Sequence, residues 1–495
     1  FPLWHGFLAL VARLGAVDPV DVGLHGPTVL APLSFAAFYE AGAVLFRSAW
    51  AGAAVVIGQV ALAALAAGHG GAFTSLALPA TVSLEVLVPA LLALFFAYVR
   101  EPTWPLFTAV AAAAGTIALI HPTYALFVGI PLVGFLVARA LLARRELGAS
   151  LAGLTALAVP VAIALAWLRP VVEATTTHNP PQSEVRQAFQ QYPGQLAGNS
   201  VHYHVTEQLF SRSGAIAVAA LLCLPLAFFA ARRRWAAFVL GGALAIFAVT
   251  LLPFVFPRFA AEVSISQARR LVGFVPFPYA LAGGAAVLAG LAGIALVPLA
   301  LAAGIGLELA YPGDFGYRFH GEAPAWPTWV AVAGGLAALV LGALLWRSQR
   351  PRRREAAAAA AVTALALPVA VHSFSHWSAS GTGASALTSG LIRALRADAR
   401  PRDVLFADPE SGYLLAAYAP VYLADSPFAH VANTKANRPR QRLLDAYRFY
   451  SRGGDLSIPR RYGARFILVD RRRHRLVLGL PRAYADARYV LYRLH

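Results

Sequence analysis

The chain has 495 residues, of which 59% are hydrophobic and only 13% are charged. This composition excludes an ordinary soluble globular protein and is typical of a polytopic membrane protein. The formal net charge is +18, but it does not indicate nucleic-acid binding, because many of the arginines occupy short turns between apolar runs. The single cysteine excludes both a disulfide framework and a thiolate metal site.

The chain opens on residues 1–26, which we expect to form an interfacial helix and a turn. Trp4 and His5 lie at its start, and no apolar run or methionine precedes them, so we expect a further helix upstream of residue 1. About twelve apolar runs follow, and each approaches the ~20 residues that cross a bilayer. They are residues 27–46, 49–68, 84–99, 104–120, 123–142, 150–168, 213–230, 235–256, 275–293, 295–311, 327–346 and 356–372. We therefore predict an α-helical polytopic membrane domain over residues 1–372.

Arginines mark alternate connections between these runs. They are Arg47, Arg100, Arg139 with Arg144 and Arg145, Arg232–Arg234, and Arg347–Arg354. Under the positive-inside rule these connections face the cytoplasm. The outer loops are then residues 1–26, 69–83, 169–212, 257–274 and 312–326, and all 13 histidines of the chain fall on the outer side. A protein whose chemistry takes place at the outer membrane face would have this pattern.

From about residue 373 the composition changes to that of a soluble domain. Short β-type runs at 404–407, 421–424, 465–470 and 489–493 alternate with helical stretches near 410–418 and 439–451. This alternation predicts a small extracytoplasmic α/β domain over residues 373–495. Asp408, Asp425 and Asp470 follow β-type runs, where we expect a structural or acceptor-docking role.

Two outer arginines carry the clearest functional signal. Arg269 and Arg270 directly precede an apolar run on the side where arginines are disfavoured. A fork of guanidinium donors suits phosphate oxygens, so we expect these residues to bind a phosphate, with an ordinary headgroup contact as the alternative. His121, at the outer end of a span, either contacts the same phosphate or simply ends the helix.

Other outer residues are candidates for contacts with substrate. Glu85 and Glu262 could orient a substrate, and Trp4 lies at headgroup level. His202, His204 and Glu207 have a spacing similar to that of metal ligands. We favour a polar loop on the acceptor side, and we assign neither a metal nor another cofactor.

Several stretches together resemble the GT-C superfamily of membrane glycosyltransferases. Residues 1–5 (FPLWH) are similar to the "P-P-L-x-x" segment that closes the first outer loop, and residues 35–50 (FAAFYEAGAVLFRSAW) to the helix that follows it. Residues 404–409, 462–470 (YGARFILVD) and 488–493 (RYVLYR) resemble strands of the outer domain of bacterial members. The likeness covers most of the chain, but it is one of layout and weak motifs.

The resemblance implies a hexosyl- or pentosyltransferase of the bacterial plasma (inner) membrane. Such an enzyme moves a sugar from a polyprenyl-phosphate donor to a glycan, lipid or protein acceptor on the outer face. The family's general base is a carboxylate in the first outer loop, which here would precede Phe1. His5 would lie beside that loop, where it either contacts the donor phosphate or anchors the chain at the membrane interface, and the family position favours the phosphate contact.

Two other functional classes remain open from the sequence. A lipid-linked-oligosaccharide flippase or other transporter would place charges at the bilayer midplane or show inverted repeats, and few such charges and no evident repeat are present. A non-enzymatic membrane scaffold would leave the one-sided histidines unexplained. We therefore favour the glycosyltransferase.

Overall fold

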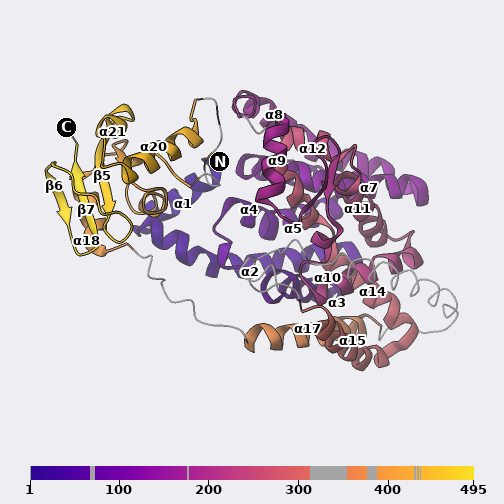
Figure 1. Cartoon of the computed structure of the whole chain (residues 1–495). Helices are drawn as coiled ribbons and strands as arrows, with labels where there is room; N and C mark the ends of the chain where they lie inside the picture. Colours follow the sequence, from indigo (N-terminus) through magenta and orange to yellow (C-terminus); the bar gives the residue numbers. More distant parts are fainter. Residues whose placement is uncertain are drawn as a thin grey trace. The chain divides into compact units, whose positions relative to one another are not determined.

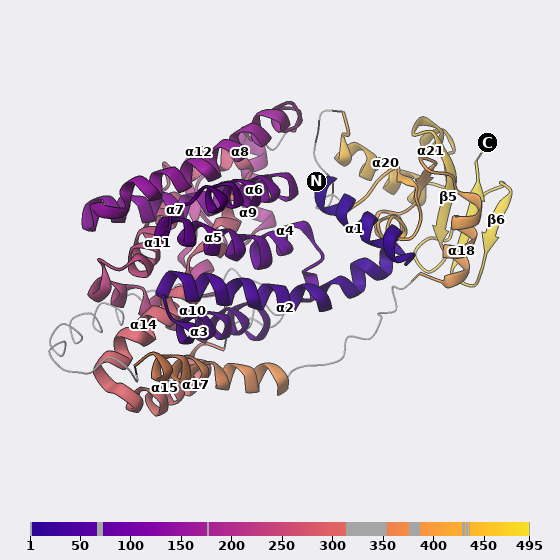
Figure 2. The ribbon, with the colours of Figure 1, turned by 180° about the vertical axis from the view of Figure 1, so that it is seen from behind.

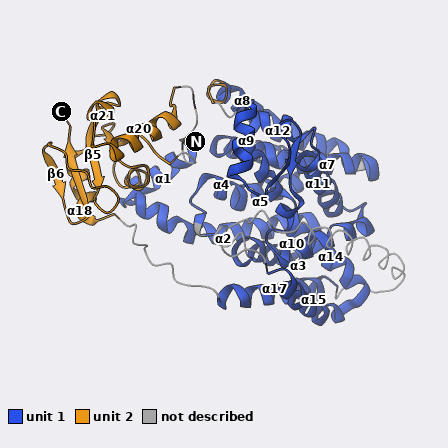
Figure 3. Ribbon diagram, viewed as in Figure 1, with its two compact units in different colours: residues 1–169, 177–377 blue, residues 170–176, 378–495 orange. Residues whose placement is uncertain are grey.

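A computed structural model describes residues 2–66, 73–175, 178–312, 354–375, 387–427, 431, 434 and 436–494. The chain divides into two compact units (Figure 3). The first comprises residues 1–169 and 177–377, and the second comprises residues 170–176 and 378–495.

The first unit is a helical bundle (Figure 1). Within the described residues, seven helical segments are long and apolar enough to cross a membrane, and four shorter apolar helices accompany them. In chain order the elements are α1 (Pro2–Gly15), α2 (Pro19–Phe46), α3 (Ala49–Val60), η1 (Ala61–Leu65), η2 (Phe73–Ser75), α4 (Pro79–Val82), η3 (Ser83–Leu87), α5 (Val88–Arg100), α6 (Trp104–Ile120), α7 (Pro122–Leu142), η4 (Arg144–Glu146), α8 (Leu147–Glu173), α9 (Gln182–Gln191), β1 (Leu196–Gly198), β2 (Tyr203–Val205), η5 (Glu207–Ser211), α10 (Ala215–Cys223), η6 (Pro225–Ala230), α11 (Arg234–Leu251), α12 (Phe256–Val263), α13 (Ile265–Ala268), η7 (Arg269–Phe274), α14 (Phe277–Ala292), η8 (Gly293–Ala295), α15 (Leu296–Ala310) and α17 (Arg354–Ser375).

Most predicted spans coincide with helices, and the differences lie at their outer ends. α2 begins at Pro19 instead of residue 27, because Asp18 accepts a hydrogen bond from the Val20 amide and Pro19 suits the first helical position. α8 continues to Glu173, so the predicted outer loop 169–212 begins later, and it also contains α9 and the β1–β2 hairpin. Residues 257–274, expected to be a loop, are mostly helical. The predicted span 327–346 and the loop residues 313–326 lie outside the described residues.

A two-residue turn joins α2 to α3, and the two helices run side by side in both views (Figure 2). Arg47 ends α2 in the left-handed conformation (φ 59°), and the Ser48 hydroxyl accepts from the Ala51 amide at the start of α3. Such a cap satisfies one of the free amides at a helix start. The turn fixes the two helices as a tight antiparallel hairpin.

Two of the predicted cytoplasmic turns contact each other in the bundle. Glu146 accepts from Arg139 at 3.0 Å and from Arg234 at 2.8 Å, and Arg139 also donates to the Arg232 carbonyl oxygen at 2.6 Å. These contacts join the α7–α8 turn to the start of α11. The arginines of these two turns are therefore close together in the fold.

The second unit contains a five-stranded sheet with strand order β4-β3-β5-β7-β6. β4, β3 and β5 are parallel, whereas β7 and β6 are antiparallel to their neighbours. Helix α18 packs its Leu391 and Leu395 on one face, and α20 packs Ala446 and Phe449 on the other. The elements are α18 (Ser389–Asp398), β3 (Val404–Phe406), α19 (Pro409–Leu415), β4 (Tyr422–Leu423), α20 (Pro439–Ser451), α21 (Ser457–Arg461), β5 (Ala464–Asp470), β6 (Arg482–Ala485) and β7 (Tyr489–Arg493). A small unit of α/β type is therefore present, with β6 as a strand that the sequence did not indicate.

Candidate functional site: a basic cavity in the helical unit

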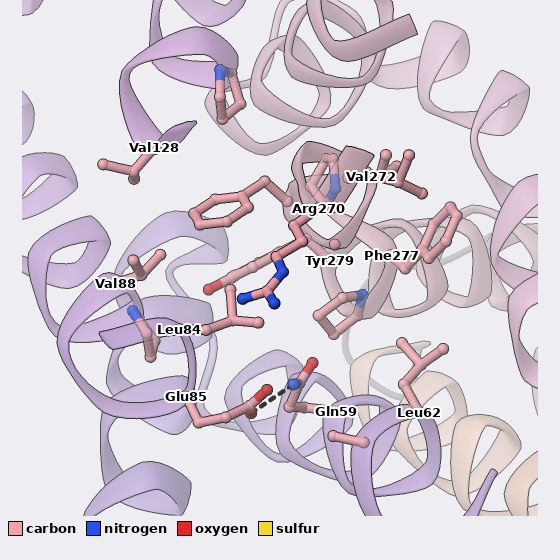
Figure 4. Close-up of a pocket in the computed structure, with 18 of the residues that line it drawn as sticks. Gln59, Leu62, Leu84, Glu85, Val88, Val128, Arg270, Val272, Phe277 and Tyr279 are labelled. Carbon is pink, nitrogen blue, oxygen red and sulfur yellow. Dashed lines mark hydrogen bonds between the residues drawn. The ribbon is translucent and has the colours of Figure 1, made fainter. Parts of the chain in front are cut away.

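A cavity of about 300 Å³ lies within the first unit (Figure 4). Its walls come from α2, α3, η1, η3, α5, α7, η5, α11, η7 and α14, and they are mostly apolar. Three arginines, Arg212, Arg269 and Arg270, line it together with one acidic residue, Glu85. Positive charge beside apolar walls suits a ligand that carries both an anionic group and a hydrocarbon part.

Glu85 is held in place by two neighbouring helices. It is only 3% exposed, and the Gln59 side-chain amide donates to its carboxylate at 2.7 Å. The Ser34 hydroxyl donates to the Glu85 carbonyl oxygen at 2.6 Å, which also fixes the backbone. Glu85 stands in the π-helical turn η3, and a second π-helical turn, η1, lines the same cavity. Single π-helical turns within longer helices are frequent at functional sites.

Arg269 is anchored away from the centre of the cavity. It donates from Nη1 to the Gln195 side-chain oxygen at 2.6 Å, and its guanidinium lies 4.0 Å from the centre of the Tyr192 ring. Both partners belong to the polar segment that precedes β1. Arg269 therefore fastens this outer segment to the wall of the cavity.

Arg270 projects into the cavity, with the bonded Glu85–Gln59 pair facing the same space (Figure 4). Its charge acts on the Tyr124 hydroxyl and on His121. The turn ahead of the two arginines passes through Ser264, a residue other than glycine with φ 77°. Backbone conformations of this kind cost free energy and cluster at binding and active sites.

Of the residues proposed from the sequence, Arg269, Arg270 and Glu85 line this one cavity. His121 lies one layer behind it, because its ring packs 4.0 Å from the ring of Tyr124, which does line the cavity. The His121 Nδ1 atom is 2.8 Å from the Thr123 hydroxyl, and His121 is 8% exposed. It is thus placed to orient Tyr124.

The remaining candidates lie elsewhere. Trp4 is buried at 6% exposure, because its indole donates to the Ala77 carbonyl oxygen at 2.6 Å and packs near Val82 and Ile120. His204 bonds through Nδ1 to the adjacent Val205 carbonyl oxygen at 2.9 Å. Outside the cavity wall are also His5, His202, Glu207 and Glu262. The part of the chain that the structure describes has no group of three or more His, Cys, Asp or Glu placed to hold a metal ion.

The sequence interpretation missed several polar residues at or beside this site, among them Gln59, Gln195 and Arg212. Gln59 is the only side-chain amide within the apolar run 49–68. A polar group inside a membrane helix is expensive and usually has a partner, so this isolation was a usable signal. Nothing in the local sequence pairs Gln195 with Arg269, since 74 residues separate them.

A separate group of acidic residues lies in the second unit, after the parallel strands. Asp408, Asp425 and Asp470 follow or end β3, β4 and β5, and all three are at most 5% exposed. Asp470 pairs with Arg488 at 3.1 Å. Neither carboxylate oxygen of Asp425 has a hydrogen-bond partner from another residue among those described. Burial, together with the neighbouring Asp408 carboxylate, raises the pKa of Asp425 to about 8.

This raised pKa predicts a pH-dependent stability of the second unit. The folded form holds a proton on Asp425 between its ordinary pKa of 3.8 and about 8, whereas the unfolded chain loses it. Stability is therefore greatest at low pH and falls as pH rises through that window. Asp425→Asn keeps the shape without the charge, so it should raise the stability at pH 9 by about 1–3 kcal/mol over wild type.

Thermal unfolding of the full chain at pH 5, 7 and 9 measures this effect. Asp398→Asn is a matched control, because the Asp398 carboxylate is partly exposed and pairs with Arg493 at 2.8 Å. Parallel pH profiles for wild type and Asp425→Asn would contradict the assignment.

Comparison with known proteins gives a structural likeness only. No family model and no curated protein sequence matches the chain. Two solved structures of ArnT from Cupriavidus metallidurans are similar to it, one bound to undecaprenyl phosphate and one in the apo state. Both matches cover 99% of this chain at 16% sequence identity. The bound structure is covered over 87% of its chain with a TM-score of 0.47, and the apo structure over 86% of its chain with a TM-score of 0.44.

Proposed function

We propose that this chain is a membrane glycosyltransferase that takes a sugar from a polyprenyl-phosphate donor. The observation that supports this most directly is the cavity that gathers Arg212, Arg269 and Arg270 against the single acidic residue Glu85. Three positive charges and one negative charge leave an excess that an anionic ligand balances. Apolar walls beside that charge suit a prenyl chain, whereas a soluble phosphate compound has no hydrocarbon part to bury against them.

The phosphate of the donor binds at Arg270 in this proposal. A guanidinium offers paired donors that match phosphate oxygens, and a charge-assisted hydrogen bond contributes on the order of 1.5–3 kcal/mol. In the transfer step the acceptor oxygen bonds to the sugar's anomeric carbon and gives its proton to the general base. The bond between that carbon and the phosphate oxygen breaks, and the polyprenyl phosphate leaves as an anion. Positive charge fixed beside that oxygen stabilises the leaving group as its charge develops.

Glu85 and Gln59 bind hydroxyl groups of the sugar. Their carboxylate and amide oxygens accept hydrogen bonds, and their existing 2.7 Å contact holds both groups in place. The GT-C resemblance implies a carboxylate as the general base that activates the acceptor. The acceptor is a glycan, lipid or protein of the cell envelope, reached at the outer face of the plasma membrane.

Transfer can be tested with the full-length protein in liposomes. Undecaprenyl phosphate, which one of the similar structures holds, has the chemistry that the cavity suits. We expect labelled sugar to leave a panel of undecaprenyl-phosphate sugars and to appear in an envelope acceptor, with release of undecaprenyl phosphate. Movement of the intact labelled lipid across the bilayer, with the sugar still attached, would instead support the transporter.

A further inference from the structure

A second cavity, of about 540 Å³, lies among the arginine-rich turns that the sequence assigns to the cytoplasmic side. Its size falls within the roughly 300–1,000 Å³ typical of ligand sites. It is bordered by the α2–α3 turn, the start of α11, the second half of α14 and the start of α17. It shares no lining residue with the basic cavity described above. Any ligand here is therefore distinct from the proposed donor.

Arg354 carries buried donors without acceptors at this cavity. Its Nε and Nη2 atoms are inaccessible to solvent and have no hydrogen-bond partner among the described residues. Leaving such a donor unsatisfied costs roughly 1–3 kcal/mol, and more for a charged group. An acceptor within the cavity would remove that cost.

Arg233 adds a second positive charge to the same lining. Among the described residues, the only acidic one in this lining is Glu355, whose carboxylate accepts from the Ser48 hydroxyl at 2.5 Å. Two guanidinium groups therefore face the cavity with one carboxylate, which is itself engaged by Ser48.

The neighbouring arginines show how this protein neutralises guanidinium groups where no ligand is needed. Arg139 and Arg234 share the carboxylate of Glu146 at 3.0 and 2.8 Å. Arg234 and Arg233 are adjacent in sequence, yet only Arg234 has this carboxylate partner. Arg233 is exposed and has no carboxylate partner among the described residues, so its guanidinium is available to an anion that enters the cavity beside Arg354.

Much of the remaining lining of the cavity is apolar. Phe46 and Trp235 stack with ring centroids 5.1 Å apart. Ala282, Val287 and Leu291 of α14 continue this surface. A ligand that joins a phosphate to a hydrocarbon chain could place its phosphate beside the arginines and bury its chain against these apolar residues.

We propose that this cavity binds a phosphate-bearing anion, with the phosphate between Arg233 and Arg354, and that the anion is the headgroup of an acidic phospholipid from the cytoplasmic leaflet. Basic pockets between transmembrane helices on the cytoplasmic side are suited to such headgroups. The site is separate from catalysis, and its ligand stabilises the junction of α3, α11, α14 and α17.

Ligand-dependent thermal unfolding of the delipidated full chain in neutral detergent tests this site. Phosphatidylglycerol should raise the unfolding midpoint saturably, and phosphatidylcholine should not. Arg354→Gln and Arg233→Gln should each raise the half-saturating concentration of phosphatidylglycerol at least threefold, and the double variant should raise it at least tenfold. Arg100→Gln is the matched control, because Arg100 is an exposed arginine of another predicted cytoplasmic turn, paired with Glu101.

Inorganic phosphate provides the second arm of the experiment. A phosphate-dependent shift that the double variant loses, without any response to phosphatidylglycerol, would assign the same site to free phosphate. Native mass spectrometry of co-purified lipid gives an independent measurement if a variant unfolds at a lower temperature. The proposal is overturned if neither ligand shifts the midpoint, or if the double variant responds and retains lipid as wild type does.

Discussion

Arg270→Ala should lower the rate of sugar transfer by tenfold or more, which corresponds to at least about 1.4 kcal/mol of transition-state stabilisation. Arg270 projects into the basic cavity (Figure 4), so its loss removes the guanidinium that faces the leaving phosphate. Arg270→Lys keeps the charge but not the paired donors, and it should recover only part of the rate.

Arg269→Ala should also lower transfer tenfold or more, for a different reason. Its contacts with Gln195 and Tyr192 hold the polar outer segment against the cavity. We therefore expect Gln195→Ala to reproduce part of this loss but not the effect of Arg270→Ala. Initial rates measured over a range of donor concentrations separate the two roles.

Arg258→Ala is the control for both substitutions. Arg258 is an exposed arginine on α12, within the predicted outer segment 257–274 that also holds Arg269 and Arg270, and it does not line the cavity. Its replacement changes the surface charge equally and should leave the rate unchanged. Wild-type rates in Arg269→Ala, in Arg270→Ala and in the double variant would remove the phosphate-binding assignment.

The membrane helices could be predicted from local sequence because two short-range rules act together. An apolar run of sufficient length must form a helix in lipid, and arginines mark the turns that stay in the cytoplasm. The start of α2 could not be placed by these rules, because the residues before Pro27 are less apolar. There the Asp18 cap and Pro19 at the first helical position start the helix earlier.

The second unit shows the same limit for strands. β3, β4, β5 and β7 correspond to apolar runs, and β5 is buried along nearly its whole length. β6 is an edge strand whose residues are exposed or half-buried. Its sequence, RAYA, has no apolar run, and it becomes a strand only because β7 offers backbone hydrogen-bonding groups beside it.

The site was only partly predictable, and the reason is geometric. Arg269 and Arg270 were found because their charge contradicts the membrane topology around them. Gln59 and Glu85 form one hydrogen-bonded pair across 26 residues, and only the fold brings α3 beside η3. The hydrogen bond from the Trp4 indole to the Ala77 carbonyl oxygen spans 73 residues, so the local sequence could not indicate it.

Gly134→Ala should destabilise the helical unit by about 3 kcal/mol, near the upper end of the usual range for overpacking. A Cβ atom on Gly134 would lie 2.0 Å from the Gly241 carbonyl oxygen, and one on Gly241 would lie 2.2 Å from the Gly134 carbonyl oxygen. Both obstacles are backbone atoms, so α7 and α11 would have to move apart. Small residues permit this close packing of membrane helices.

Gly129→Ala, also on α7, is the matched control, because no atom lies within 4 Å of its added Cβ. It should be neutral or slightly stabilising, since alanine favours a helix more than glycine does. Unfolding midpoints and the yield of monodisperse protein measure the difference between the two variants. Because Gly134 and Gly241 block the same approach, the double variant Gly134→Ala/Gly241→Ala should cost less than the sum of the single changes. Strict additivity, or a Gly134→Ala protein as stable as Gly129→Ala, would show that α7 and α11 do not meet at these two glycines.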